Sequence, residues 1–246
     1  AKRLCDLSEK RCDSMGDKMK ESNYKKLVYN TAIFAIGNFG SKVLTFLIVP
    51  LYTYVLTTAE YGVIDLFITS LGMVIPFSTM MVNEALIRYV LGKELTPKEA
   101  ASNCFAVFLF GAAISVLFTP LYKVAFDFDE YIWIFVALLV LRTFNQVFSE
   151  YFRAVNQNVK FTIFGLITTA TILGFNVVFL LFLKLGIRGY LYATLLSAAV
   201  GTLYILIFSD FFQVVSLKCI DKNTIRMLLK YSVPLIPNSL MWWIMS

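Results

Sequence analysis

The stretch YIWIFVALLVLRTFNQVFSEYFRA, residues 131–154, determines how this chain is interpreted. It is long and apolar enough to cross a bilayer, which takes about 20 residues, and yet it carries Arg142 near its centre. An arginine in the middle of a membrane helix costs at least about 2.5 kcal/mol unless it faces protein, water or an anion. The stretch therefore predicts a membrane helix with a polar face turned toward a protected interior.

Five further apolar stretches accompany this one, and short polar segments separate them. Hydrophobic residues make up 59% of the chain and charged residues 15%, whereas soluble domains carry about 25% charged residues. The mean hydropathy of +0.73 likewise excludes a soluble core of this size. We therefore expect an all-α integral membrane protein with helices at residues 28–56, 62–90, 99–122, 131–154, 160–184 and 188–212, and a seventh that starts near residue 232.

Several classes of function need residues that this composition lacks. The absence of histidine excludes HExxH metalloproteases and other histidine-dependent membrane enzymes for the part of the protein seen here. The four cysteines show no CxxC spacing, so no zinc site is expected, and the only aspartates inside expected spans, Asp65 and Asp210, lie near opposite sides of the membrane and cannot form the facing pair that intramembrane aspartyl proteolysis needs. The basic residues lie between apolar stretches, which argues against nucleic acid despite the net charge of +6. We expect no enzyme activity, no catalytic residue and no metal.

The distribution of lysine and arginine predicts the orientation of the helices. Most of the 22 basic residues lie in the N-terminal tail and on the loops that share its side of the membrane. Only Lys123, Lys184 and Arg188 lie on the loops of the other side. Because cytoplasmic loops are enriched in basic residues, we expect the N-terminus to be cytoplasmic.

Three of the expected helices carry polar side chains along one stripe, at the spacing of an α-helix. Polar stripes on separate membrane helices predict a shared wet interior, because lipid would leave such groups unsatisfied. The candidate residues are Asn38, Lys42 and Thr45 in the first helix, Asp65 and Asn83 in the second, and Arg142, Asn145, Gln146 and Glu150 in the fourth.

Each stripe also has a purely structural interpretation. Lys42 and Asp65 could neutralise each other across two helices, and Glu84 with Arg88 has the spacing of a helix-stabilising pair. Arg142 is harder to explain in this way, because no acidic residue lies within one turn of it in its own helix. We therefore favour an anionic ligand for Arg142 and leave both interpretations open for Lys42.

Four stretches carry a resemblance to a known family. They are GSKVLTFLIVPLYTYVLTTAEYGVIDL (40–66), EALIRYV (84–90), LRTFNQVFSEYFRA (141–154) and YSVPLIPNSLMWW (231–243). Together they resemble the polysaccharide flippases, the transporters of lipid-linked oligosaccharides in the multidrug/oligosaccharidyl-lipid/polysaccharide superfamily. The first and last stretches are the most distinctive, and no single invariant motif defines the superfamily.

The resemblance implies a transporter of 12 to 14 helices in two lobes around a central cavity, located in the bacterial inner membrane. This chain would supply the six-helix N-terminal lobe (27–215), a cytoplasmic inter-lobe linker (216–231) and the start of a second lobe (232–246). Residues 1–26 would form a basic cytoplasmic tail, and residues 1–14 are expected to be non-native because Met15 or Met19 would give the usual short basic lead. Ser246 falls within an apolar run, so we expect the chain to be a fragment of a longer protein.

The implied activity is the movement of an undecaprenyl-diphosphate-linked oligosaccharide from the inner to the outer leaflet by alternating access, for O-antigen, capsule or another surface glycan. The implied partners are this substrate, membrane lipids and other proteins of the pathway such as a glycan polymerase. A diphosphate needs cations and a sugar needs hydroxyls and amides, because unsatisfied polar groups are costly in hydrocarbon. We assign the diphosphate to Lys42 and Arg142, the sugar to Asn38, Thr45, Asn83, Asn145 and Gln146, and any Na+ or proton coupling to Asp65 or Glu150.

Two other functions remain open at this point. A multidrug or cation exporter of the same superfamily is expected to favour acidic cavity groups, which Arg142 argues against. A receptor or scaffold that transports nothing would need its membrane-embedded charges for folding alone.

Overall fold

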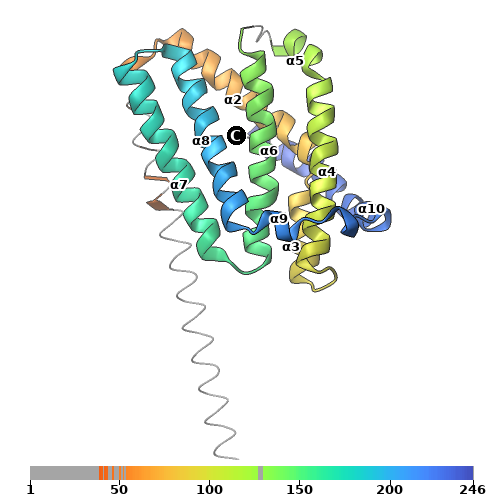
Figure 1. Ribbon diagram of the computed structural model, residues 1–246. Helices are drawn as coiled ribbons and strands as arrows, with labels where there is room; N and C mark the ends of the chain where they lie inside the picture. The colour runs from red at the N-terminus through yellow and green to blue at the C-terminus, as the bar shows by residue number, and fades with distance from the viewer. Residues whose placement is uncertain are drawn as a thin grey trace, which may run out of the picture.

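The computed structural model describes residues 54–126 and 130–245 and, before them, Phe39, Gly40, Lys42, Val43, Phe46, Pro50 and Tyr52. The described residues form helices joined by short connections, and no strand occurs among them (Figure 1). Five of these helices are long and apolar enough to cross a membrane. The structure therefore confirms the predicted all-α membrane architecture.

The bundle is organised around one central helix. The five long helices are α2 (Thr58–Thr79), α4 (Pro97–Leu117), α6 (Ile132–Ala154), α7 (Asn158–Asn176), which continues as the π-helical segment η1 (Val177–Phe182), and α8 (Gly186–Phe208). Figure 1 shows α6 in the middle, with α8 and α7 on one side and α4 on the other. The helix contacts α2, α4, α7 and α8 and also α3 (Val82–Leu91). This position explains why apolar residues of the stretch at 131–154 occupy several sides of the helix while its polar stripe is confined to one.

The expected second span is not one continuous helix. It divides into α2 and α3 at Met80 and Met81, whose φ angles of 48° and 53° are left-handed. Pro76 cannot donate a backbone hydrogen bond, and the Thr79 hydroxyl oxygen accepts one from the Met81 N–H at 3.1 Å. The prediction of a single helix at 62–90 was therefore wrong, because the loosened end of α2 allows the chain to change direction inside the span.

Two helices begin at capping boxes, which explains why they start earlier than expected. Thr57 and Glu60 exchange backbone and side-chain hydrogen bonds at the start of α2, and Thr96 and Glu99 do the same at the start of α4. The third span is also interrupted, since α4 ends at Leu117 and a short helix, α5 (Thr119–Phe126), follows. Side-chain hydrogen bonds therefore set several boundaries that hydropathy places a few residues away.

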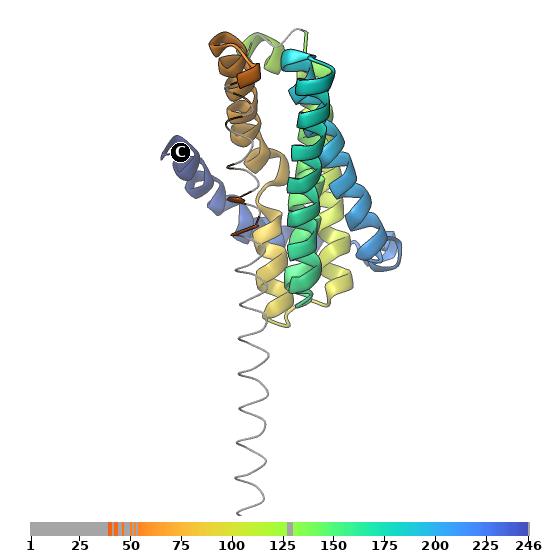
Figure 2. The same ribbon diagram turned by 90° about the vertical axis from the view of Figure 1, so that its left-hand side faces the viewer.

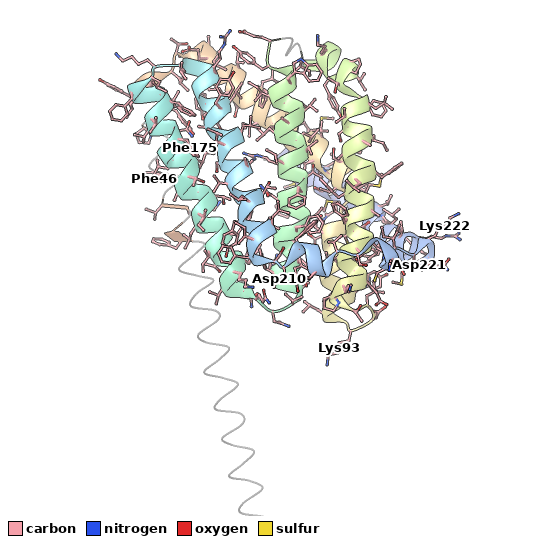
Figure 3. The ribbon with its side chains drawn as sticks, in the orientation of Figure 1. Phe46, Lys93, Phe175, Asp210, Asp221 and Lys222 are labelled. Atoms are coloured by element: carbon pink, nitrogen blue, oxygen red, sulfur yellow. The ribbon has the colours of Figure 1, made fainter. Side chains whose placement is uncertain are left out.

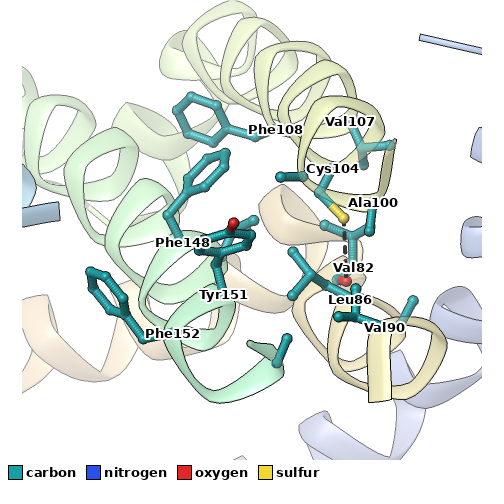
Figure 4. Packing of buried hydrophobic residues seen from close by; sticks show 14 of the residues in the cluster. Val82, Leu86, Val90, Ala100, Cys104, Val107, Phe108, Phe148, Tyr151 and Phe152 are labelled. Atoms are coloured by element: carbon teal, nitrogen blue, oxygen red, sulfur yellow. Dashed lines mark hydrogen bonds between the residues drawn. The ribbon is translucent and has the colours of Figure 1, made fainter. Parts of the chain in front are cut away.

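Two apolar clusters fill the bundle, one in each half of its height. The first joins α3, the start of α4, the second half of α6 and the end of α8, and Figure 4 shows part of it around Cys104, Leu86 and Phe148. The second joins α2, the first half of α6 and the first half of α8. Along α6 the two clusters are separated by the turn that follows Leu139 and precedes Phe144. Arg142 lies in that turn.

The segment after α8 is more structured than the predicted linker. It contains α9 (Phe211–Val214), the short 3-10 turn η2 (Leu217–Cys219) and α10 (Lys222–Ser232). A second 3-10 turn, η3 (Val233–Leu235), leads into α11 (Ile236–Met245), which leans away from the bundle in Figure 2. The Trp243 indole N–H donates to the Thr69 carbonyl of α2 at 2.9 Å, so α11 stays attached to the long helices.

Candidate functional site

A cavity of about 530 Å³ lies within the bundle, at the height of the turn that separates the two clusters. Residues of α2, α6, α7 and α8 line it, and Tyr52 contributes from the chain before α2. Hydroxyl and amide groups predominate among the polar side chains of the wall. The lining comprises Tyr52, Tyr61, Ile75, Arg142, Asn145, Gln146, Ser149, Phe164, Thr168, Thr169, Ile172, Tyr190, Thr194, Ser197 and Ala198.

Arg142 carries the only full charge among the described residues that line the cavity. No aspartate or glutamate occurs in that lining, and Arg142 forms no ion pair with any part of the chain that the structure describes. Tyr52 and Tyr190 also line the cavity, and their rings meet edge to face with centroids 5.2 Å apart. An unneutralised guanidinium in a cavity favours an anionic ligand, and its planar fork suits phosphate oxygens.

Asn145 holds α6 against α8. Its Nδ2 donates to the Ala198 carbonyl at 2.9 Å, and its Oδ1 accepts from the Thr202 hydroxyl at 3.0 Å. A Cβ at Gly201 would lie 3.1 Å from this Nδ2 and 2.8 Å from the Thr168 methyl group. The glycine therefore allows α8 to lie this close to α6 and α7. Asn145 borders the cavity, but both ends of its amide already have protein partners. Its neighbour Gln146 has no such partner within the described chain, and its amide is available to a ligand.

The cavity wall formed by α7 and α8 presents hydroxyl groups. Thr168 and Thr169 donate to carbonyl groups one turn earlier in α7, and Ser197 donates to the Thr168 carbonyl at 2.8 Å. A hydroxyl that donates in this way keeps lone pairs that can accept hydrogen bonds. Such a wall suits a ligand rich in hydroxyl donors.

The structure brings together three of the residues predicted from the sequence, namely Arg142, Asn145 and Gln146, at one cavity. Lys42 and Asp65 are both exposed and lie outside its described lining, and no ion pair joins them within the described residues. The other two predicted residues of the first helix, Asn38 and Thr45, lie outside the part of the chain that the structure describes.

Two further candidates have protein partners away from the cavity. The Glu150 carboxylate pairs with the Arg153 guanidinium at 2.7 Å. Asn83 is buried in α3 and its Nδ2 donates to the Glu84 carboxylate at 3.2 Å. Neither Glu150 nor Asn83 is among the residues that line the cavity.

Sequence reasoning missed the contribution of α8. Tyr190, Thr194 and Ser197 line the cavity at intervals of four and three residues, which is the spacing of one helix face. The same stripe analysis that found the fourth helix would have identified them.

Comparison with known proteins gives the family. The family model for polysaccharide biosynthesis proteins matches residues 27–246. No curated protein matches the chain.

Several solved structures have a similar fold. A MATE transporter in complex with Br-NRF is similar with a TM-score of 0.67 at 18% identity, covering 87% of this chain and 57% of that one. An outward-facing multidrug resistance MATE family transporter of the MOP superfamily has a TM-score of 0.61 at 15% identity, covering 86% and 50%. A MOP superfamily transporter from Pyrococcus furiosus has a TM-score of 0.58 at 15% identity, again covering 86% and 50%.

These likenesses show the fold, and the chain spans about half the length of the structures that it matches. Its membrane-capable helices and its similarity to one half of these transporters agree with a multi-pass membrane protein. The family match extends over nearly all of the chain and includes the helices that form the cavity. The chain therefore belongs to the polysaccharide biosynthesis protein family, and its fold is similar to one half of a MOP superfamily transporter.

Proposed function

We propose that the protein to which this chain belongs flips an undecaprenyl-diphosphate-linked oligosaccharide from the inner to the outer leaflet of the bacterial inner membrane. Arg142 binds the diphosphate, and the hydroxyl and amide groups around it contact the first sugars. The observation that carries this proposal is the single unpaired cation in a cavity whose described lining contains no acidic residue. Such a cavity attracts an anion and repels a cationic drug.

The mechanism needs no covalent step. The cavity would replace the water around the diphosphate and sugar, because each polar group left unsatisfied in hydrocarbon costs several kcal/mol. The polyprenyl tail would remain in the bilayer while the lobes alternate between inward-open and outward-open states. The basic tail and loops support a cytoplasmic N-terminus, and the precursor would enter the cavity from that same side.

The coupling ion belongs to the same proposal. Asp65 is exposed on α2, whereas Glu150 is already paired with Arg153. If Na+ or a proton drives the cycle, Asp65 is the one of these two candidates whose carboxylate has no ion pair within the described residues.

Cation export is the competing function. The similar structures include multidrug resistance MATE transporters. However, the Pyrococcus furiosus transporter is described as having a binding pocket of reversed polarity that suggests a different function, so the shared fold admits pockets of either charge. Here the charge of the cavity lining favours an anionic substrate.

Deleting the full-length gene in its host tests the proposal. The deletion should abolish the surface glycan and cause lipid-linked precursor to accumulate. Wild type and Arg188→Ala should restore the glycan, whereas Arg142→Ala, expressed at the same level in the membrane, should not. Arg188 is a matched control because it is an exposed arginine that pairs with Glu130 away from the cavity. An unchanged glycan together with new sensitivity to cationic drugs would refute flipping and support export.

A further inference from the structure

α10 is an amphipathic helix with a basic outer face. Lys222, Arg226 and Lys230 follow one another at intervals of four residues, and all three side chains are exposed. On the opposite face Leu228 is completely buried, and Ile225 and Leu229 pack against the first apolar cluster. The pattern fixes which side of α10 faces the protein and which side faces outward.

Specific contacts hold α10 in this orientation. The Arg88 guanidinium of α3 lies 4.3 Å from the centre of the Tyr231 ring, and the Tyr89 and Tyr231 rings meet edge to face. At its N-terminus the Asp221 carboxylate accepts from the Thr224 N–H at 2.9 Å and caps the helix. The basic face cannot turn inward without breaking the contacts of Tyr231 with α3 and the burial of Leu228.

The segment that leads into α10 is attached near the start of α4. The Ser102 hydroxyl oxygen accepts from the Ser216 N–H at 2.9 Å, and the Asn103 side chain bonds the Cys219 carbonyl at 3.1 Å and the Asp221 N–H at 2.9 Å. These residues lie about 8 to 9 Å along α4 from Pro97, at about 1.5 Å per residue. An amphipathic helix with lysine and arginine on its polar face is suited to the boundary between headgroups and acyl chains, and this attachment near the start of a membrane-capable helix fits such a position.

The exposed charges of α10 have no acidic partner within the described chain. Lys222, Arg226 and Lys230, and Lys218 just before the helix, form no ion pair with a described residue. Figure 3 shows Lys222 at the outer end of α10, projecting away from the bundle. α10 lies across the bundle beside α3 and α4 and not along the long helices (Figures 1 and 2).

We propose that this face, formed by Lys222, Arg226 and Lys230, binds the anionic headgroups of the phospholipids that border α10. The charge and exposure of the face, and its attachment near the start of the membrane-capable helix α4, suit a layer of phosphate groups. The contact would hold the segment between α8 and α11 in place at the membrane surface, and it does not depend on which substrate the cavity carries.

Native mass spectrometry of the full-length protein in detergent tests this proposal, with phosphatidylglycerol and phosphatidylcholine of identical acyl chains as probes. Wild type should retain phosphatidylglycerol about tenfold more strongly than phosphatidylcholine, because each basic residue near an anionic surface contributes measurably to binding. The triple variant Lys222→Gln, Arg226→Gln, Lys230→Gln should lose most of this preference. The control Lys93→Gln, Lys98→Gln, Lys184→Gln removes three exposed charges elsewhere and should keep it.

Thermal unfolding should be the same for both variants, because all the altered side chains are exposed. Three results would overturn the assignment: no preference for phosphatidylglycerol in wild type, an equal loss of preference in the control, or displacement of the lipid by inorganic phosphate at the same concentration. The last result would identify a site for free anions and not for a lipid surface.

Discussion

Arg142 and Asn145 lie one turn apart on the same helix and have different surroundings. Arg142 faces the cavity, and no acidic group occurs in the described lining, whereas both ends of the Asn145 amide bond to α8. The sequence was sufficient to predict that Arg142 faces a protected interior, since an unpaired arginine in lipid is costly. It was not sufficient to place Asn145, because the partners Ala198 and Thr202 come from a helix more than fifty positions away.

Replacing Asn145 with leucine should therefore lower the stability of the bundle, whether or not Asn145 also contacts the substrate. Asn145→Leu removes two hydrogen bonds between α6 and α8, which at about 0.6 to 1 kcal/mol each in a membrane bundle amounts to about 1 to 2 kcal/mol. A lower midpoint of thermal unfolding in detergent would show this. Gln146→Leu is the control and should leave the midpoint nearly unchanged, because Gln146 makes no such link; equal losses in the two variants would contradict the assigned role.

At the scale of elements, α2 is positioned by a close approach to α4. A Cβ at Gly111 would lie only 1.9 Å from the Ser78 carbonyl oxygen, and the Ser78 and Ser115 hydroxyls are 2.6 Å apart. In the chain, the break at Met80 and Met81 begins two residues after Ser78. Hydropathy could predict the span but not this break, because neither methionine is a residue that favours a left-handed conformation.

Gly111→Ala should consequently disturb the junction of α2 and α4. The obstructing atom belongs to the backbone, so a helix must move, and we expect a loss of about 1 to 3 kcal/mol as in overpacked cores. Gly174→Ala in α7 is the control, since a Cβ there meets nothing within 4 Å and alanine favours the helix. Unfolding in detergent measures both, and a Gly111→Ala variant as stable as wild type would show that the close approach is not required.

The cap of α10 gives a prediction about pH. Hydrogen bonds from the Thr224 N–H and hydroxyl lower the pKa of the Asp221 carboxyl group. Because the pKa is lowered, the cap contributes its full stabilisation of α10 at pH values above about 4, the ordinary pKa of aspartate. This contribution is lost as the pH falls through the lowered pKa.

Hydrogen exchange of the α10 amides should accordingly be faster in Asp221→Ala than in wild type at pH 7. The difference should vanish under strongly acidic conditions, whereas Asp221→Asn should retain much of the protection at both pH values because asparagine also caps helices. Equal exchange in wild type and Asp221→Ala at pH 7 would show that the cap does not hold α10.

For the whole molecule, composition and span length were sufficient to predict the class, and the resemblance led to the family that the comparison shows. It was harder to predict which of the candidate residues line the cavity. Arg142, Asn145 and Gln146 meet at the cavity, but Glu150, although it lies on the stripe of Arg142, forms an ion pair with Arg153 instead. A stripe identifies one face of a helix, whereas membership of a cavity depends on which neighbours cover that face along its length.

Binding of the anionic headgroup is the most direct test of the central claim that Arg142 makes this cavity an anion site. The measurement is the affinity of the purified full-length protein for an undecaprenyl-diphosphate-linked oligosaccharide, in wild type, Arg142→Gln, Arg142→Lys and Arg188→Gln. Arg142→Gln should weaken binding by about 10- to 100-fold, the cost of losing a charge-assisted contact; Arg142→Lys should recover part of it, and Arg188→Gln should bind as wild type does. Equal affinity in wild type and Arg142→Gln, with both proteins folded, would contradict the claim.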